Sequence, residues 1–378
     1  MILEPVDGAD ARAVLRGLRG AVLGAGPAIA LGAPAGSTGA AGREVPAGTA
    51  VVVTTSGSTG HPKSVVLSRA ALTAGALATA SRIGDGAWLL ALPPAYIAGV
   101  QVLVRALVAG REPAILSGSF TASGFAAAAA SMASSEGGVR VPSYTSLVPA
   151  QLQTLIDAED AGVRTGIDSF AAVLVGGQAL PPALAERAAA AGARVVRTYG
   201  SSETSGGCVY DGRPLDDVDV RIVDGEVQLS GAVLADGYLD DPARTAAAFV
   251  RDGHGRRWYR TGDTGVFTDG VLAVTGRRDN VIVSGGINIS LDRVERAVRT
   301  VPGLEQAVVV PVSDERWGQA SVVVAARGGA AGFAAARVAV AAAIGPHARP
   351  ARVVEVDEIP LLASGKPDRP ALARLAAG

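Results

Sequence analysis

The stretch that most constrains the fold is residues 51–68, which read VVVTTSGSTGHPKSVVLS. Three valines are followed by hydroxyl residues and glycines, then by Lys63 and a second apolar run. This order predicts a strand, a loop and a second extended segment, because β-branched residues favour strands and Gly/Ser runs interrupt them. The loop glycines let the backbone approach a ligand, and the hydroxyls and the lysine can bind a polyphosphate. Residues 54–63 are therefore a candidate phosphate-binding loop.

Specific residues distinguish this loop from two alternatives. In the P-loop of nucleotide triphosphatases a glycine precedes the lysine, whereas this chain has Pro62 there. Proline offers no N–H to a phosphate, so the pattern belongs to a different phosphate loop. The other alternative is a flexible linker, and residues 36–42, GSTGAAG, have that composition. They lack the strand-like lead-in and the lysine, and we interpret them as a linker.

Lysine is nearly absent from the chain. Lys63 and Lys366 are the only lysines among 34 basic residues, and the others are arginines. An ammonium and a guanidinium are not interchangeable, so a chain with few lysines keeps them where a compact charge is required. Both lysines are therefore candidate functional residues.

Length, charge and cysteine content limit the classes of protein to which the chain could belong. A chain of 378 residues with net charge −1 is long enough for two or more domains and has no basic field that would indicate nucleic-acid binding. No leader sequence and no membrane-spanning stretch is recognisable, which predicts a soluble, cytoplasmic protein. The single cysteine, Cys208, excludes a disulfide framework, and we expect it to be buried and inert. We assign no catalytic role to the histidines, which lie in polar loops.

The first two hundred residues alternate between helical and extended patterns. We expect helices at residues 10–23, 69–83, 100–109, 120–134, 145–157 and 181–191, and strands at 87–92, 112–116, 139–141, 170–177 and 193–199. This alternation implies βαβ units and a mainly parallel sheet. From about residue 218, short strands separated by turns predict a small antiparallel or barrel-like segment.

The C-terminal hundred residues form a separate pattern. Helices are expected at residues 291–300 and 333–344, and strands at 306–312, 320–326 and 351–356. We therefore predict an α/β protein with a large domain, residues 1–278, followed by a small mobile α+β domain, residues 279–378. In the large domain, the turns at Gly176-Gly177 and at Tyr199 follow parallel strands, at the sheet edge where ligands collect.

Five motifs occur in order between residues 54 and 369: TSGSTGHPK, YGSSET, YRTGD, GRRDNVIVSGGINI and SGKPDR. Together they resemble the acyl-adenylate-forming enzymes, a superfamily that includes acyl- and aryl-CoA synthetases, adenylation domains of peptide synthetases, and luciferases. The resemblance implies a reaction in which a carboxylate attacks the α-phosphate of ATP, pyrophosphate leaves, and a thiol then displaces AMP. It implies ATP, Mg²⁺ and CoA as ligands and a small carboxylic acid as the substrate.

The resemblance assigns the ATP-binding residues of the large domain. The β- and γ-phosphates are expected on a loop comprising Thr54, Thr55, Ser56, Gly57, Ser58, Thr59, Gly60 and Lys63. The adenine is expected between the turn Tyr199-Gly200-Ser201 and the pair Gly176-Gly177. Ser202, in place of the usual threonine, is expected near the α-phosphate, and Glu203 is the expected Mg²⁺ ligand.

The remaining motifs carry the ribose site, the hinge and the second half of the reaction. The resemblance implies that Asp263 binds the ribose hydroxyls and that Arg277 contacts the same sugar or a phosphate. Asp279 matches the hinge about which the small domain swings. Gly285 and Gly286 are expected to line the channel for the pantetheine arm. Lys366 matches the lysine that bridges the carboxylate and the α-phosphate during adenylation.

Two features narrow the choice of the carboxylic acid substrate. The short length and the run SLVPAQL at residues 146–152 resemble the o-succinylbenzoate:CoA ligases of menaquinone biosynthesis, and the Ala/Arg-rich composition suits an actinobacterial type. In the segment LPPAYIAG, Tyr96 replaces the usual histidine as the gate of the carboxylate pocket. We expect substrate contacts from Tyr96, Gly99 and Ser146. A second substrate carboxylate could be matched by Arg140, Arg197, Ser143 or Ser146, and the sequence does not choose among them.

Alternatives to this function stay open at the level of sequence. The chain could be another short aryl- or acyl-CoA ligase, or a stand-alone adenylation domain that loads a carrier protein. From a different class, it could be an inactive ATP-binding module. Intact Lys63, Glu203, Asp263 and Lys366 argue against that last interpretation. A homodimer is one possible assembly.

Overall fold

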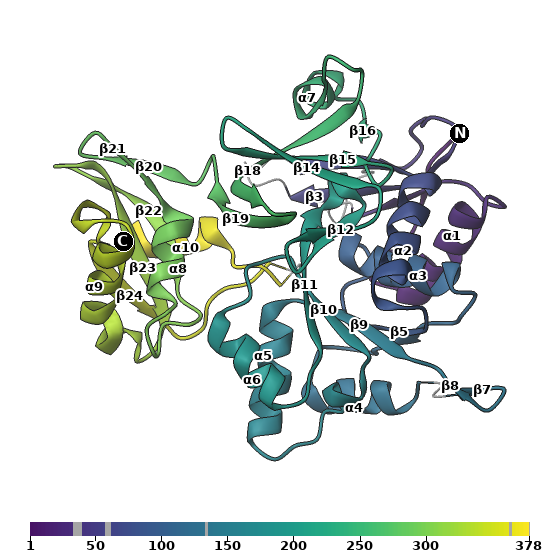
Figure 1. The fold of residues 1–378 in the computed structure, drawn as a ribbon, viewed down its shortest axis with the longest axis horizontal. Helices are drawn as coiled ribbons and strands as arrows, with labels where there is room; N and C mark the ends of the chain where they lie inside the picture. Colours follow the sequence, from purple (N-terminus) through teal and green to yellow (C-terminus); the bar gives the residue numbers. More distant parts are fainter. Residues whose placement is uncertain (33–39, 57–61, 133–134, 363–364, 378) are drawn as a thin grey trace.

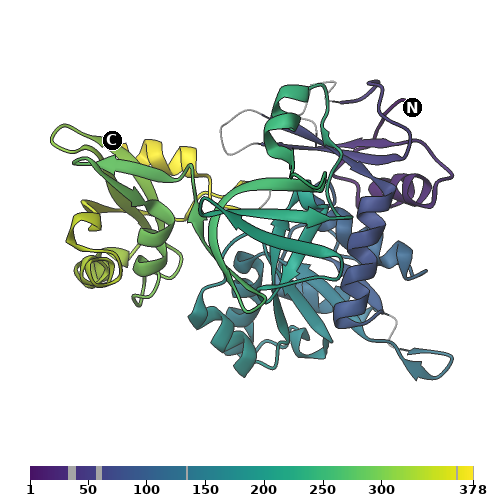
Figure 2. The same cartoon turned by 45° about the horizontal axis from the view of Figure 1, so that its top comes forward.

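The computed structural model describes residues 1–32, 40–56, 62–132, 135–362 and 365–377. A large N-terminal part contains three sheets with helices packed around them, and a smaller C-terminal part lies to one side (Figure 1, left). The turned view in Figure 2 shows the same division. The predicted α/β class, with a large domain followed by a small α+β domain, is confirmed.

A seven-stranded sheet forms the centre of the large domain. Its strand order is β13-β12-β11-β10-β9-β5-β6. The parallel strands are β5 (Ala87–Leu90), β6 (Ala114–Ile115), β9 (Ser143–Leu147), β10 (Ala172–Val175) and β11 (Val195–Ser201), while β12 (Gly206–Tyr210) and β13 (Arg213–Pro214) run antiparallel. The intervening helices are α3 (Ile97–Val108), α4 (Ala122–Ala130), α5 (Pro149–Asp160) and α6 (Pro182–Ala190). The predicted mainly parallel sheet is therefore present.

One predicted helix begins later than expected, and one predicted strand pairs outside the main sheet. Residues 145–147 belong to strand β9, and α5 begins only at Pro149. Proline is tolerated in the first helical turn but disfavours helix in the residue before it, so Pro149 marks the start of the helix. The strand expected at residues 139–141 is present as β8 (Val139–Arg140), but among the described residues it pairs with β7 (Ser135–Glu136) alone, in a hairpin beside the seven-stranded sheet (Figure 1).

A second sheet carries the candidate phosphate loop. Its order is β1-β2-β3-β4-β16, comprising β1 (Glu4–Pro5), β2 (Ile29–Leu31), β3 (Thr49–Ser56), β4 (Pro62–Ser68) and β16 (Gly237–Tyr238). Strands β3 and β4 pair antiparallel, which confirms the predicted strand, loop and second extended segment. Residues 57–61 lie outside the described residues. Helix α2 (Arg69–Ile83) follows β4 directly, and the Ser68 hydroxyl caps it by accepting from the Ala71 N–H.

Helix α1 and the antiparallel segment complete the large domain. The amphipathic helix α1 (Ala11–Leu23) begins after its N-cap Asp10, as predicted. The third sheet has the order β14-β15-β18-β17, and β19 pairs with β18. Its strands are β14 (Val218–Val223), β15 (Glu226–Gly231), β17 (Phe249–Arg251), β18 (Arg257–Thr268) and β19 (Val271–Arg277), with α7 (Pro242–Ala248) before β17. All pairings in it are antiparallel, which confirms that part of the prediction.

The C-terminal part is built on a sheet of five strands: β20 (Val281–Ser284), β21 (Ile287–Ser290), β22 (Val308–Asp314), β23 (Gly318–Ala326) and β24 (Arg352–Val356). Helices α8 (Leu291–Val298) and α9 (Phe333–Ala343) share one apolar cluster with it. Helix α10 (Arg369–Ala377) shares a second cluster through Leu372 and Ala376. The sequence did not predict α10. The boundary between residues 278 and 279 stays a prediction.

Gly99 offers a test of the packing at the start of α3. A side chain at this buried position would place Cβ 2.2 Å from the Pro93 carbonyl oxygen. We expect Gly99→Ala to lower the free energy of unfolding by about 2 kcal/mol, the cost of overpacking a rigid contact. Chemical denaturation of the purified chain measures this change.

The matched control is Gly253→Ala, because a Cβ there meets nothing within 4 Å. We expect the control to change stability by less than about 0.5 kcal/mol. Equal stabilities of the two variants would show that the backbone at Gly99 relaxes without cost.

Candidate active site

The first cluster joins the phosphate-loop hairpin to the turn after β11. The Lys63 ammonium on β4 pairs with Glu203 Oε1, and the Tyr238 hydroxyl donates to the same oxygen at 2.8 Å. Only 1% of the Glu203 side chain is exposed, against 27% for Lys63. Burial alone would raise the pKa of Glu203, but the Lys63 charge and the two hydrogen bonds outweigh it and hold that pKa below its usual value. Glu203 is therefore an ionised carboxylate inside the protein.

The second cluster lies around Asp263. The Tyr199 hydroxyl donates to Asp263 Oδ2 at 2.6 Å, and Arg277 Nη1 donates to Oδ1 at 3.0 Å. Asp263 and Arg277 are direct cross-strand partners on β18 and β19, which brings their side chains together. Burial raises the pKa of Asp263, although Tyr199 and Arg277 both oppose this shift. The carboxylate has both oxygens held in place.

Arg277 also reaches the predicted hinge. Its Nε and Nη2 donate to the two carboxylate oxygens of Asp279 at 2.8 and 3.0 Å. Its backbone N–H donates to Asp292 at 2.7 Å, and Asn280 donates to the other oxygen of Asp292. One arginine thus connects the Asp263 cluster to the first residues of the small domain.

Lys366 comes to the large domain on a tight turn. The Leu362 N–H donates to the Lys366 carbonyl at 2.7 Å, and the Gln178 amide donates to the Gly365 carbonyl at 3.2 Å. Lys366 Cε lies 3.7 Å from the position that a Cβ of Gly177 would occupy. The Lys366 side chain keeps contact with solvent. Although the residue is exposed, desolvation by the surrounding protein atoms, together with the positive charges of Arg277 and Lys63, lowers its pKa.

The glycines of the two strand-end turns have different surroundings. A Cβ at Gly176 would lie 2.3 Å from Thr198 Oγ1, and one at Gly200 would lie 2.1 Å from the Gly206 carbonyl oxygen. Both positions allow neighbouring strands to pack closely. Gly177 instead has φ +81° and faces Lys366, so it leaves space beside the lysine.

Several hydroxyls surround these clusters. The Thr54 and Ser64 hydroxyls lie 2.9 Å apart. Within the described part of the chain, Thr55 Oγ1 and Ser201 Oγ are buried and have no hydrogen-bond partner. Ser202 is buried at the start of the turn that holds Glu203. Of the other predicted loop residues, Ser56 ends β3, while Gly57, Ser58, Thr59 and Gly60 lie outside the described residues.

The predicted substrate residues lie on two elements, the start of α3 and strand β9. Tyr96 is the half-buried N-cap of α3, and Gly99 packs against Pro93. Ser146 on β9 is buried, and its hydroxyl has no partner among the residues that the structure describes. Buried hydroxyls normally have a partner, so Ser146 is the most informative of the three.

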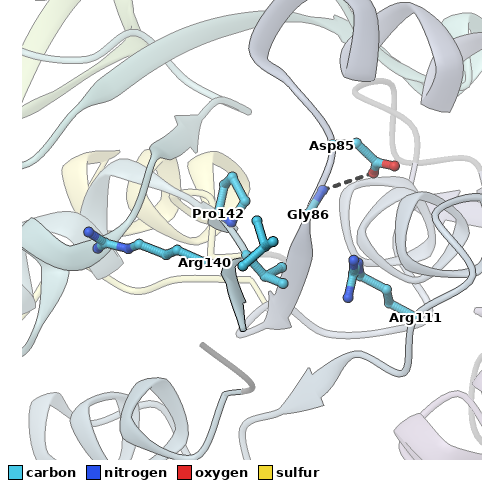
Figure 3. A pocket seen from close by; sticks show the side chains of 7 residues that line it. Asp85, Gly86, Arg111, Arg140 and Pro142 are labelled. Carbon is cyan, nitrogen blue, oxygen red and sulfur yellow. Dashed lines mark hydrogen bonds between the residues drawn. The ribbon is translucent and has the colours of Figure 1, made fainter. Parts of the chain in front are cut away.

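Two of the arginines considered for a second substrate carboxylate lie elsewhere. Arg140 lines a pocket of about 270 Å³ with Asp85 and Arg111 (Figure 3). The lining residues precede β5, β6 and β9, at the amino ends of these strands and opposite the Gly177 edge. Arg197 is exposed and pairs with Asp211 at 3.0 Å. Arg140 is therefore not brought to the two clusters, and Arg197 is occupied by an acidic neighbour.

The glycine pair of the small domain is also apart from the other site residues. Gly285 and Gly286 form the turn of the β20–β21 hairpin, with φ +57° and +81°. Gly285 lies against the Trp317 ring, and nothing lies within 4 Å of a Cβ at Gly286. This hairpin points away from the large domain, whereas the chain before α10 runs toward it (Figures 1 and 2).

Tyr238 is a site residue that the sequence did not single out, because a tyrosine in a GY pair gives no chemical signal of its own. Burial, and then the Glu203 charge, raise its pKa. Cys208 is buried as expected, and burial raises the pKa of its thiol to about 12. In the described ranges, no group of three or more His, Cys, Asp or Glu side chains could hold a metal ion.

Comparison with known proteins gives a consistent family. The AMP-binding enzyme model matches residues 19–239, and the model of the AMP-binding enzyme C-terminal domain matches residues 293–366. A Mycobacterium tuberculosis protein named "Probable 2-succinylbenzoate–CoA ligase" is 40% identical over 347 residues, 89% of this chain and 87% of that protein.

Two solved structures are similar along most of the chain. An o-succinylbenzoate CoA synthetase from Bacillus subtilis, in complex with the acyl-adenylate intermediate, has a TM-score of 0.70 and 26% identity, covering 86% of this chain and 69% of that one. An amide bond synthetase from Marinactinospora thermotolerans has a TM-score of 0.74 and 26% identity, covering 93% and 76%. In the described residues, no helix has the length and apolar character needed to cross a membrane.

The lowered pKa of Lys366 can be measured directly, because the chain has only two lysines. We expect trace labelling with an amine-reactive reagent to begin at lower pH for Lys366 than for an added free lysine derivative. The reason is that burial and the Arg277 and Lys63 charges favour the neutral amine. Peptide mass spectrometry across a pH series measures the labelling.

Arg277→Gln removes one of these charges and should move the Lys366 pKa back toward its ordinary value. If Lys366 in the unmodified chain titrates like the free derivative, its predicted placement among these charges is wrong.

Proposed function

Because the chain belongs to the AMP-binding enzyme family, we propose that it is a 2-succinylbenzoate–CoA ligase acting through an acyl-adenylate. The single observation that carries this proposal is the 40% identity to the Mycobacterium tuberculosis protein, which extends over most of both chains. The overall reaction converts a carboxylate, ATP and CoA into an acyl-CoA, AMP and pyrophosphate. The proposal places the enzyme in menaquinone biosynthesis.

In the first half-reaction, a carboxylate oxygen of the acid attacks the α-phosphorus of ATP. The new P–O bond forms as the bond to the bridging oxygen breaks, and pyrophosphate leaves. We assign Lys366 to the carboxylate and the α-phosphate, where its ammonium offsets the charge that develops. Ser202 is assigned to the same phosphate. No general base is needed, since the carboxylate of the acid is already ionised.

The rest of ATP binds to the large domain in this proposal. Asp263 accepts from the two ribose hydroxyls, and its oxygens are positioned for this by Tyr199 and Arg277. Lys63 and the hydroxyls of the 54–59 segment bind the β- and γ-phosphates. The unpartnered Thr55 hydroxyl supports a ligand on this side. The turns at Gly176-Gly177 and at Gly200-Ser201 enclose the adenine.

Mg²⁺ is implied by the family, and the donor set fits a metal that arrives with the nucleotide. Glu203 supplies one buried carboxylate, and Mg²⁺ is usually bound by one or two carboxylates together with phosphates and waters. When bound, Mg²⁺ neutralises phosphate charge during transfer. Lys63 must share or release Glu203 in that state, because it now pairs with the same carboxylate.

In the second half-reaction, the thiol of CoA attacks the acyl carbonyl of the adenylate. The C–S bond forms, the bond to the phosphate oxygen breaks, and AMP leaves. We propose that the domain of residues 279–378 turns about Asp279 for this step, so that Gly285 and Gly286 replace Lys366 beside the adenylate. The outward position of the hairpin supports a turn of this kind. Cytoplasmic location and a homodimer stay predictions.

The acid would be bound between the start of α3 and the end of β9. We assign Tyr96 and Ser146 to this pocket, and the unpartnered buried hydroxyl of Ser146 is the observation that supports a polar ligand there. Gly99 contributes by letting α3 pack closely on the Pro93 turn that precedes Tyr96. Which donors bind the second carboxylate stays open between Ser143 and Ser146.

Pyrophosphate release from ATP with a panel of carboxylic acids tests this proposal. We expect 2-succinylbenzoate to give the highest kcat/KM, and benzoate and succinate, which each carry only part of it, to give little. Omission of CoA should stop turnover after roughly one equivalent of pyrophosphate. A simple amine in place of CoA should not restore turnover, and restoration by it would favour the amide-forming alternative.

Two variants should separate the half-reactions. We expect Lys366→Ala to slow adenylation about a hundredfold, the effect of removing one preorganised donor, and to retain thioester formation from preformed acyl-adenylate. Gly286→Leu should retain adenylation and block CoA transfer. Single-turnover assays of each half-reaction measure both effects.

Gly303→Leu is the matched control for the glycine variant. It has a similar φ of +85°, and a Cβ there also meets nothing within 4 Å. Both glycine variants carry the same backbone strain, so only a role of Gly286 in the second half-reaction separates them. Equal loss in both halves for Lys366→Ala would rule out the two-orientation mechanism.

A further inference from the structure

Tyr238 is tied to the candidate active site twice. Its backbone lies in β16, which pairs with β4 through Gly237 and Val66 and through Tyr238 and Val65. The adjoining Leu239 N–H donates to the Ser64 carbonyl at 2.8 Å. These bonds fix the tyrosine next to the strand that carries Lys63. Its hydroxyl reaches across to Glu203 Oε1 at 2.8 Å.

Tyr238 and Lys63 both donate to the same oxygen of Glu203. The Lys63 ammonium pairs with Oε1 and also lies 5.6 Å from the centre of the Tyr238 ring. A carboxylate that is 1% exposed is costly without partners, so these two donors account for much of its stability in the ionised form. The two donors are not equivalent, because the Lys63 side chain is flexible and charged, whereas the Tyr238 hydroxyl sits on a rigid ring.

The two donors respond differently to a polyphosphate. An ammonium is drawn to phosphate oxygens, and the Lys63 side chain has four rotatable bonds with which to follow them. Tyr238 is held by β16, by its N–H donating to Thr245 Oγ1 at 2.9 Å, and by packing on Phe249 with ring centres 6.0 Å apart. The hydroxyl therefore stays at Glu203 when Lys63 leaves.

We propose that Tyr238 is a positioning residue that holds Glu203 in place for the metal accompanying ATP while Lys63 transfers to the polyphosphate. The inference rests on the proposed function, since it takes ATP with a divalent cation as the ligand. Tyr238 itself touches neither substrate. It acts through the carboxylate, so its removal should weaken the contribution of the metal to ATP binding more than binding of the nucleotide itself.

The test is calorimetric ATP binding to the full chain, with Mg²⁺ and with EDTA. The readout is the ratio of the two affinities, which does not depend on turnover. Tyr238→Phe keeps the ring and removes only the hydroxyl. We expect it to lower the ratio about tenfold, the effect of losing one hydrogen bond to a charged group, and to change the EDTA affinity less than about twofold.

Tyr210→Phe is the control. It also removes a buried hydroxyl, one that interacts with Thr79 at 2.9 Å and accepts from Arg105 at 3.1 Å, away from Glu203. We expect the ratio of the control to equal that of the unmodified chain. An equal fall in both variants, or an unchanged ratio in Tyr238→Phe, would overturn the inference.

A double-mutant cycle covers the case of a poorly folded single variant. In a Glu203→Gln background the metal contribution should already be small, and adding Tyr238→Phe should lower the ratio no further. A further fall of several-fold would mean that the tyrosine acts independently of the carboxylate. If the unmodified chain binds ATP equally with and without Mg²⁺, the proposed function itself fails, which separates that outcome from failure of the inference alone.

Discussion

The ion pair between Lys63 and Glu203 joins the two sheets on which the site depends. Lys63 lies on β4 of the five-stranded sheet, and Glu203 follows β11 of the seven-stranded sheet. A carboxylate this deeply buried must be paired, and removal of its partner would leave an uncompensated charge. The pair therefore fixes the distance between the phosphate hairpin and the turn after Tyr199. In the inference above, the Lys63 ammonium can be replaced by a metal, whereas the Tyr238 hydroxyl keeps its hydrogen bond to Glu203.

The two lysines differ in their electrostatic surroundings. The Lys63 ammonium pairs with the Glu203 carboxylate. Lys366 comes close to Arg277 and Lys63, and their charges lower its pKa. Arg277 is occupied by Asp263 on one side and by Asp279 on the other. A phosphate or carboxylate bound next to Lys366 would offset the positive charges that lower its pKa.

Short local motifs in the sequence named residues that the structure brings into contact. Tyr199 on β11 and Asp263 on β18 lie in two such motifs, and although the strands belong to different sheets, the Tyr199 hydroxyl donates to the Asp263 carboxylate. Prediction failed where a contact is set by distant chain segments. Tyr238 meets Glu203 only because β16 pairs with β4. Ser143–Leu147 became a strand because its neighbours β5 and β10 supplied hydrogen-bond partners on both sides. Pro149 is the local signal for the start of α5, because proline is tolerated in the first helical turn and disfavours helix in the residue before it.

The Lys366 segment and the β20–β21 hairpin lie on different sides of the small domain, and the roles proposed for both have an energetic consequence. Both Lys366 and Gly286 are assigned to the same adenylate, so neither orientation of the domain can be held too tightly. Contacts of the Lys366 turn with the large domain include the Gln178 hydrogen bond of 3.2 Å and the packing of Gly365 near Val148. Weak contacts of this kind can be exchanged for others at little cost in free energy. Arg277 makes the stronger contact, because it donates two parallel hydrogen bonds to Asp279. This contact holds the segment about which the small domain would turn, and not the body of that domain.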